Sequence, residues 1–164
     1  MKRCCKKKWA FAGLAIFFIA GCSAGTVGGP DLSKLVPVSG IVTLDDKPLA
    51  DALVTFDPRT AAGFHGAVGR TDQSGKYELE TDAGNGKTKK GVIPGSYNVT
   101  LSKFTKADGT PMTLDPNLGG PMNQGAIQAI PFKYLGGSEE GFSFTVPEGG
   151  GTYDIKMDTA GAGS

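Results

Sequence analysis

The most informative shortage in this chain is histidine, because its 164 residues include only His65. Ser-His-Asp catalysis needs that residue beside a nucleophile and an acid, and no strained nucleophile turn of the Gly-x-Ser-x-Gly kind is present. A zinc site takes three or four nitrogen or sulfur ligands, and no cysteine follows Cys22. We therefore expect no catalytic residue, no metal and no cofactor, and we expect that the protein is not an enzyme.

Cysteine is also scarce, with Cys4, Cys5 and Cys22 all near the N-terminus. The rest of the chain can form no internal disulfide, so its stability must come from packing. Helical periodicity is missing as well, since no segment repeats its apolar residues every 3.6 positions. The 26 glycines and 10 prolines suit many turns and few helices.

The N-terminus has the three parts of an export signal. Five cations precede an apolar run over residues 9–20, and they are Lys2, Arg3, Lys6, Lys7 and Lys8. A run of about a dozen residues is too short to span a membrane, which takes about 20, but it suits a signal peptide. We expect residues 1–21 to be a signal peptide.

The end of this run, Ile19-Ala20-Gly21-Cys22, resembles the lipobox of bacterial lipoproteins, with Ile19 in place of leucine. The resemblance implies cleavage before Cys22 and a lipid on its thiol, which would anchor the exported protein to a membrane. Ser23 stands where an inner-membrane retention aspartate would stand in enteric bacteria. We therefore expect the outer membrane, facing the periplasm or the cell surface.

Charge argues against nucleic acid as a partner. Residues 1–21 hold five of the 17 Lys and Arg and none of the 16 Asp and Glu, so 12 cations and 16 anions remain, a net charge of −4. A mildly acidic domain offers no electrostatic attraction to phosphate backbones or anionic lipid. Residues 22–35 are rich in small and polar residues, and we expect a flexible tether.

The remaining chain is typical of short strands joined by turns. Apolar and polar residues alternate clearly over 96–102, where Tyr97, Val99 and Leu101 share one face. Seven strands are expected, over residues 38–44, 52–57, 65–71, 76–80, 96–102, 142–146 and 153–157. Residues 45–48 and 72–75 are expected turns, and the polar residues 82–90 an expected loop. Residues 72–75 also have a trace of a calcium loop, but they lack its run of carboxylates.

Three segments resemble signatures of carboxypeptidase regulatory-like domains: residues 38–52, 71–77 and 93–99. That family implies a transthyretin-like (prealbumin-like) fold, an antiparallel Greek-key β-sandwich, over residues 36–159. Together with the lipobox and residues 130–134, the pattern resembles small envelope lipoproteins of planctomycete-type bacteria. These signatures specify a fold better than an activity.

An irregular insertion over residues 104–141 interrupts the expected sandwich. Its apolar residues follow no strand pattern, so they must either pack on the sandwich or contact a partner. We expect a partner-binding loop, mobile in isolation over residues 105–128, with residues 130–135 docked as a short extended piece. Its apolar side chains are Phe104, Met112, Leu114, Leu118, Met122 and Ile127.

Two functions fit these observations. The first is a non-catalytic, lipid-anchored envelope module that binds protein or polysaccharide or has a structural role. The second is an accessory subunit that positions a separate envelope enzyme, as the family resemblance suggests. The identity of the partner separates the two.

Overall fold

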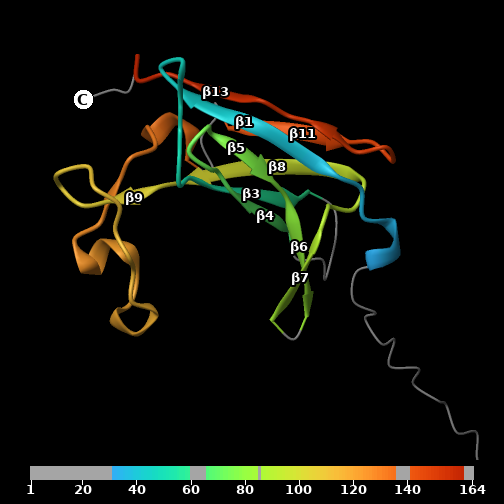
Figure 1. Ribbon diagram of the computed structural model, residues 1–164, viewed down its shortest axis with the longest axis horizontal. Helices are drawn as coiled ribbons and strands as arrows, with labels where there is room; N and C mark the ends of the chain where they lie inside the picture. The colour runs from blue at the N-terminus through green and yellow to red at the C-terminus, as the bar shows by residue number, and fades with distance from the viewer. Residues whose placement is uncertain (1–30, 60–65, 85, 136–140, 161–164) are drawn as a thin grey trace, which may run out of the picture.

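The protein folds as an all-β sandwich, as the sequence predicts, in a computed structural model that describes residues 31–59, 66–84, 86–135 and 141–160 (Figure 1). The lipobox, Cys22 and His65 lie outside these ranges. The only helices among the described residues are short 3-10 turns, and none is long and apolar enough to cross a membrane. All seven expected strand segments contain strands.

The larger sheet has six strands, and every pairing in it is antiparallel. In spatial order the strands are β11 (Phe142–Val146), β8 (Gly95–Ser102), β3 (Leu53–Pro58), β4 (Ala67–Arg70), β6 (Glu80–Gly84) and β7 (Lys87–Lys90). Phe56 pairs with Val99 on β8, and Phe144 pairs with Tyr97. The period-2 alternation of these strands directs one apolar face toward the second sheet.

The smaller sheet is built around β1 (Val38–Leu44). On one side of β1 lie β2 (Lys47–Pro48) and β5 (Lys76–Glu78), both antiparallel to it. On the other side lie β12 (Gly151–Thr152) and β13 (Ile155–Met157), and both run parallel to β1. The sheet is therefore mixed rather than wholly antiparallel. Two parallel strands need a crossover connection between them. Here the connection from β1 to β12 contains every strand of the six-stranded sheet, so local sequence pattern could not reveal the parallel pairing.

A close contact joins β1 to the C-terminal segment, which breaks between β12 and β13. The Tyr153 carbonyl oxygen turns inward there and accepts a hydrogen bond of 2.7 Å from the Tyr77 hydroxyl. The Asp154 carboxylate accepts a bond of 2.9 Å from the backbone N–H of Ile41. Gly40 makes this approach possible, because a Cβ at that position would lie 1.9 Å from the Tyr153 oxygen.

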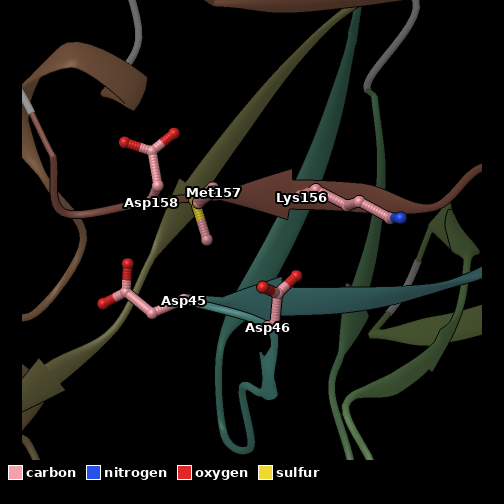
Figure 2. Close-up of a pocket in the computed structure, with 5 residues that line it drawn as sticks. All are labelled: Asp45, Asp46, Lys156, Met157 and Asp158. Carbon is pink, nitrogen blue, oxygen red and sulfur yellow. The ribbon is translucent and has the colours of Figure 1, made fainter.

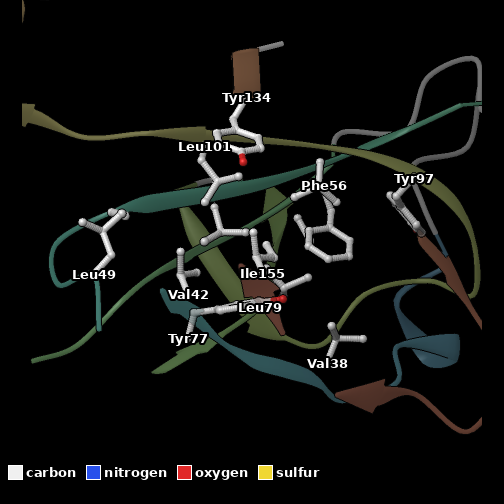
Figure 3. Close-up of a cluster of buried hydrophobic side chains, with 14 of the residues drawn as sticks. Val38, Val42, Leu49, Phe56, Tyr77, Leu79, Tyr97, Leu101, Tyr134 and Ile155 are labelled. Carbon is white, nitrogen blue, oxygen red and sulfur yellow. The ribbon is translucent and has the colours of Figure 1, made fainter. Parts of the chain in front are cut away.

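The core lies between the two sheets and centres on Phe56, which is fully buried (Figure 3). Its ring centroid is 5.8–6.5 Å from those of four other rings, Tyr77, Tyr97, Phe144 and Tyr153. The predicted apolar face of β8, with Tyr97, Val99 and Leu101, is buried. Val146 on β11 and Ile155 and Met157 on β13 are buried with it. Phe142 and Phe144 are only partly buried because β11 is an edge strand of its sheet. Tyr153, between β12 and β13, is partly buried as well.

Two predicted turns have identifiable causes. Asp45 and Asp46 both have positive φ, 50° and 58°, and close a two-residue hairpin between β1 and β2. In the other turn, one Asp72 oxygen accepts hydrogen bonds from the Ser74 N–H, the Ser74 hydroxyl and the Lys76 N–H. These bonds favour a plain turn over a calcium loop.

Residues 82–90 were predicted as a loop, and this prediction is wrong, because β6 and β7 form a hairpin there. Glu80 pairs with Lys90 across the two strands, and the Thr88 hydroxyl donates to the Glu80 carboxylate at 2.7 Å. All residues of β7 are exposed. A hairpin solvated in this way has no apolar alternation, so sequence pattern cannot detect it.

The expected tether is also shorter than predicted, because its last residues are ordered. Leu32–Lys34 form a 3-10 turn, η1, that Asp31 caps by accepting from the Ser33 N–H. The Lys89 ammonium donates to the Leu32 carbonyl at 2.9 Å. Val36 then bridges to Val92 and joins the chain to the sandwich.

The insertion lies at one end of the sandwich, and η1 lies at the other (Figure 1). Its described part consists of β9 (Phe104–Thr105), η2 (Pro116–Leu118), η3 (Pro121–Gln124), β10 (Ile127–Gln128) and η4 (Phe132–Tyr134). Ile130 and Tyr134 are buried against the core. The predicted docking is therefore correct for these two side chains, although the segment is a 3-10 turn rather than extended.

Candidate functional site

A concave site of about 550 Å³ lies where the insertion meets the six-stranded sheet, and we call it the insertion hollow. Strand register determines which residues of the sheet line it, because Leu53 on β3 lies between Arg70 on β4 and Ser102 on β8. Side chains at paired positions of neighbouring strands share one face. The three therefore form a row at the end of the sheet.

The insertion supplies the apolar wall of this hollow. Three of the predicted partner-binding residues, Phe104, Met112 and Leu114, line it. β9 pairs with β10, and Thr105 also bridges to Pro111, which holds the intervening loop against the strand. The sequence therefore identified this wall, whereas the Arg70–Leu53–Ser102 row requires the strand pairing.

The junction between β8 and the insertion is fixed by one amide side chain. The Gln128 Oε1 atom accepts hydrogen bonds from the backbone N–H groups of Lys103, at 2.9 Å, and Ile130, at 3.2 Å. The Ala129 N–H donates to the Lys103 carbonyl at 2.8 Å. These bonds hold both strands of the insertion beside the hollow.

The rim of the hollow has two cations and one anion: Arg70, Lys103 and Asp51. The Arg70 guanidinium donates to the Asp51 backbone carbonyl at 3.3 Å. Asp51 has a positive φ of 57°, and its N–H donates to the Thr71 carbonyl. The hollow thus joins an apolar wall to a rim with an excess of positive charge.

A second feature of the insertion is its tip, residues 115–125. The Gln124 amide organises the tip, since its oxygen accepts from the Asp115 N–H and its nitrogen donates to the carbonyls of Asp115 and Gly119. Asp115 caps η2 by accepting from the Asn117 N–H at 2.8 Å. These bonds give the tip a defined local conformation in the structure, and the mobility expected of residues 105–128 in isolation stays a prediction.

The tip exposes two more of the predicted partner-binding residues. Leu118 is 64% exposed and Met122 is 69% exposed. Ile127 and Phe132 are exposed as well, so Phe132 does not dock with Tyr134 as predicted. No charged residue occurs between positions 116 and 132. Residues 116–132 therefore carry no charge and expose four large apolar side chains.

A second, smaller concave site has three carboxylates (Figure 2). Asp45 and Asp46 come from the turn after β1, and Asp158 follows Lys156 and Met157 of β13. Asp45 accepts from the N–H and the hydroxyl of Thr159. Asp158 accepts from the Lys133 ammonium, at 2.7 Å, and from the Tyr134 hydroxyl, and the bond from Lys133 is the main reason that its pKa is lowered. These bonds give Asp45 and Asp158 structural roles.

Metal chemistry finds no support in the part of the chain that the structure describes. No group of three or more His, Cys, Asp and Glu side chains there is placed to hold an ion. Where the pKa of a described group is shifted, the cause is a local hydrogen bond, an ion pair or burial. Hydrogen bonds lower the pKa of Asp72, and burial raises that of Tyr97.

Comparison with known proteins gives little further information. No family model matches the chain, and no curated protein matches it. One solved structure, a 9R-lipoxygenase from Cyanothece PCC8801, aligns with a TM-score of 0.34 and 17% identity over 77% of this chain. The chain spans 17% of the length of that protein. A likeness this weak supports no functional argument.

Proposed function

We propose that the protein is a non-catalytic, lipid-anchored β-sandwich module of the cell envelope that binds a protein or polysaccharide through its insertion. The Ile19-Ala20-Gly21-Cys22 sequence supports a lipid anchor on Cys22. The carboxypeptidase regulatory-like, transthyretin-like family is part of this proposal and rests on the strand and turn signatures. The outer membrane, with the module facing the periplasm or the cell surface, is the proposed location.

The observation that favours binding most is the position of the insertion. It lies at the end of the sandwich opposite to η1, where the chain arrives from its N-terminal segment (Figure 1). An anchor on Cys22 would therefore leave the hollow and the tip at the far end of the module. Binding sites commonly lie on loops held by a rigid scaffold.

The composition of the insertion supports the same function. The cores of protein interfaces are depleted of charged residues and enriched in methionine and aromatic side chains. The tip has this character, since residues 116–125 carry no charge and Leu118 and Met122 are exposed there. The wall of the hollow adds Phe104 and Met112, although charged residues also line the hollow. The tip exposes Leu118 and Met122 within one short segment, and apolar side chains gathered on a surface often mark an interaction site.

Partner capture tests this proposal. The full-length chain is expressed in a bacterial envelope, cross-linked and purified, and a variant with Leu118→Asn and Met122→Gln is compared with it. Ile41→Thr is the matched control, because Ile41 is also exposed but lies on β1 in the other sheet. We expect the wild type and the control to retain the same partner and the tip variant to lose it.

The identity of that partner separates the two functions. A separate envelope enzyme in stoichiometric amount would favour the accessory role, whereas a polysaccharide or a non-enzymatic protein would favour the binding module. Equal retention by the tip variant and the wild type would refute binding through the insertion.

A further inference from the structure

We propose that the tip of one copy inserts into the insertion hollow of a second copy, so that the protein pairs with itself through the insertion. This inference rests on the proposed function, because it names the partner of the same surface. One chain offers both halves of the contact: Leu118 and Met122 project from the tip, and Phe104, Met112 and Leu114 form an apolar wall.

The tip is built to present its side chains without a large ordering cost. Gln124 holds Asp115 and Gly119 through three hydrogen bonds of 2.9–3.1 Å. Preorganised contacts lose less conformational entropy on binding than flexible ones. These hydrogen bonds satisfy backbone polar groups within the tip, and the side chains of Leu118 and Met122 remain exposed to a partner.

Charge favours a second copy as the occupant. A symmetric pair brings identical surfaces together, so any charge near the two-fold axis would be repelled by its own copy. Residues 116–132 contain no charged residue, so they are free of this repulsion. The charged residue at the base of the tip is Asp115, whereas the rim of the hollow has Arg70, Lys103 and Asp51. The acidic base of one tip would meet the net positive rim of the other copy.

Symmetry and the proposed anchor both fit this pair. Each copy supplies one tip and one hollow, so a two-fold arrangement occupies both hollows and closes without forming a filament. A membrane is the less suitable occupant of the tip, because the insertion lies at the end of the sandwich opposite to η1 (Figure 1). Two copies anchored in one membrane would contact each other at their far ends.

Site-specific cross-linking tests the pair in the full-length protein. Cys4 and Cys5 are replaced by serine, and two tagged copies are co-expressed, one with Met122→Cys and one with Met112→Cys. A short thiol cross-linker should join them at least about tenfold more efficiently than it joins Ile41→Cys to Met112→Cys. Equal yields for the two combinations, or no cross-linked pair, would overturn the proposal.

Co-purification of two tags from detergent-solubilised membranes gives a second measurement. Met122→Gln removes one apolar side chain from an exposed position and should weaken the pair by about tenfold or more. Ile41→Thr should leave it unchanged. A pair that survives Met122→Gln would overturn the proposed contact. A protein that remains monomeric but still captures an envelope partner would refute self-pairing and leave the proposed function standing.

Discussion

Replacing Gly40 by alanine should disrupt the junction between β1 and the C-terminal segment. A Cβ there would lie 1.9 Å from the Tyr153 carbonyl oxygen, 2.6 Å from its carbon and 2.9 Å from the Tyr77 ring. The first two neighbours are backbone atoms, so a side-chain rotation cannot relieve the contact. The segment must move away from β1.

The magnitude follows from what that movement breaks. Three hydrogen bonds hold the junction, from Tyr77 Oη to the Tyr153 carbonyl, from the Ile41 N–H to Asp154 and from the Tyr153 N–H to the Ser39 carbonyl. Each contributes about 0.5–1.5 kcal/mol net, and overpacking typically costs about 1–3 kcal/mol. A shift of the segment weakens these bonds without abolishing all three, so we expect Gly40→Ala to lower the free energy of unfolding by about 2–4 kcal/mol, below the full sum.

Urea unfolding followed by circular dichroism measures this loss. Gly120→Ala is the control, because Gly120 has a negative φ and no atom lies within 4 Å of its added Cβ. The control should stay within about 0.5 kcal/mol of the wild type. A Gly40→Ala variant equally close to the wild type would show that the parallel junction between β1 and the C-terminal segment is wrong.

Two further predictions concern the edge strand and a turn. Phe144→Ala should lower the free energy of unfolding by about 2–3 kcal/mol, less than the ~3–5 kcal/mol lost with a fully buried phenylalanine. Replacing its exposed neighbour, Ser143→Ala, should change the free energy of unfolding by no more than about 0.5 kcal/mol. Similar losses for the two variants would show that the inward and outward faces of β11 were misassigned. The pKa of Asp72 is lowered, first by the Ser74 hydroxyl and then by the Lys76 N–H. A depressed pKa in the folded state gives stability that is present above the unfolded pKa and is lost as pH falls toward the folded one. The melting temperature should therefore fall less between about pH 7 and acid pH in Asp72→Asn than in the wild type. Equal falls in melting temperature for the two proteins would contradict the role of this carboxylate.

Local pattern predicted the strands because each is half-buried. In β8, Tyr97, Val99 and Leu101 are buried, and the residues between them are more exposed. The turn before β8 also has a physical cause. The Tyr97 hydroxyl donates to the Ile93 carbonyl four residues upstream, and burial raises the pKa of Tyr97 to about 12. A tyrosine placed in this way fixes the entry of a strand into a sandwich.

Long-range pairing could not be predicted in the same way. The parallel partners of β1 are more than 100 residues away, and the Asp154 bond to Ile41 depends on that pairing. The candidate site shows the same division. Apolar residues of the insertion were identified because no strand pattern buried them, whereas Arg70 and Leu53 became part of the hollow only through the register of β3 and β4.

The measurement that tests the central claim most directly is the mass of the N-terminal peptide of the full-length protein recovered from bacterial membranes. We predict cleavage before Cys22 and a peptide that begins at this residue with a diacylglyceryl group on its thiol. In the Cys22→Ala variant, that modified peptide should be absent and the protein should leave the detergent phase or remain uncleaved. An unmodified Cys22 thiol in the wild type, or a cleaved variant that still partitions into detergent as the wild type does, would contradict the proposal of a lipid-anchored envelope module.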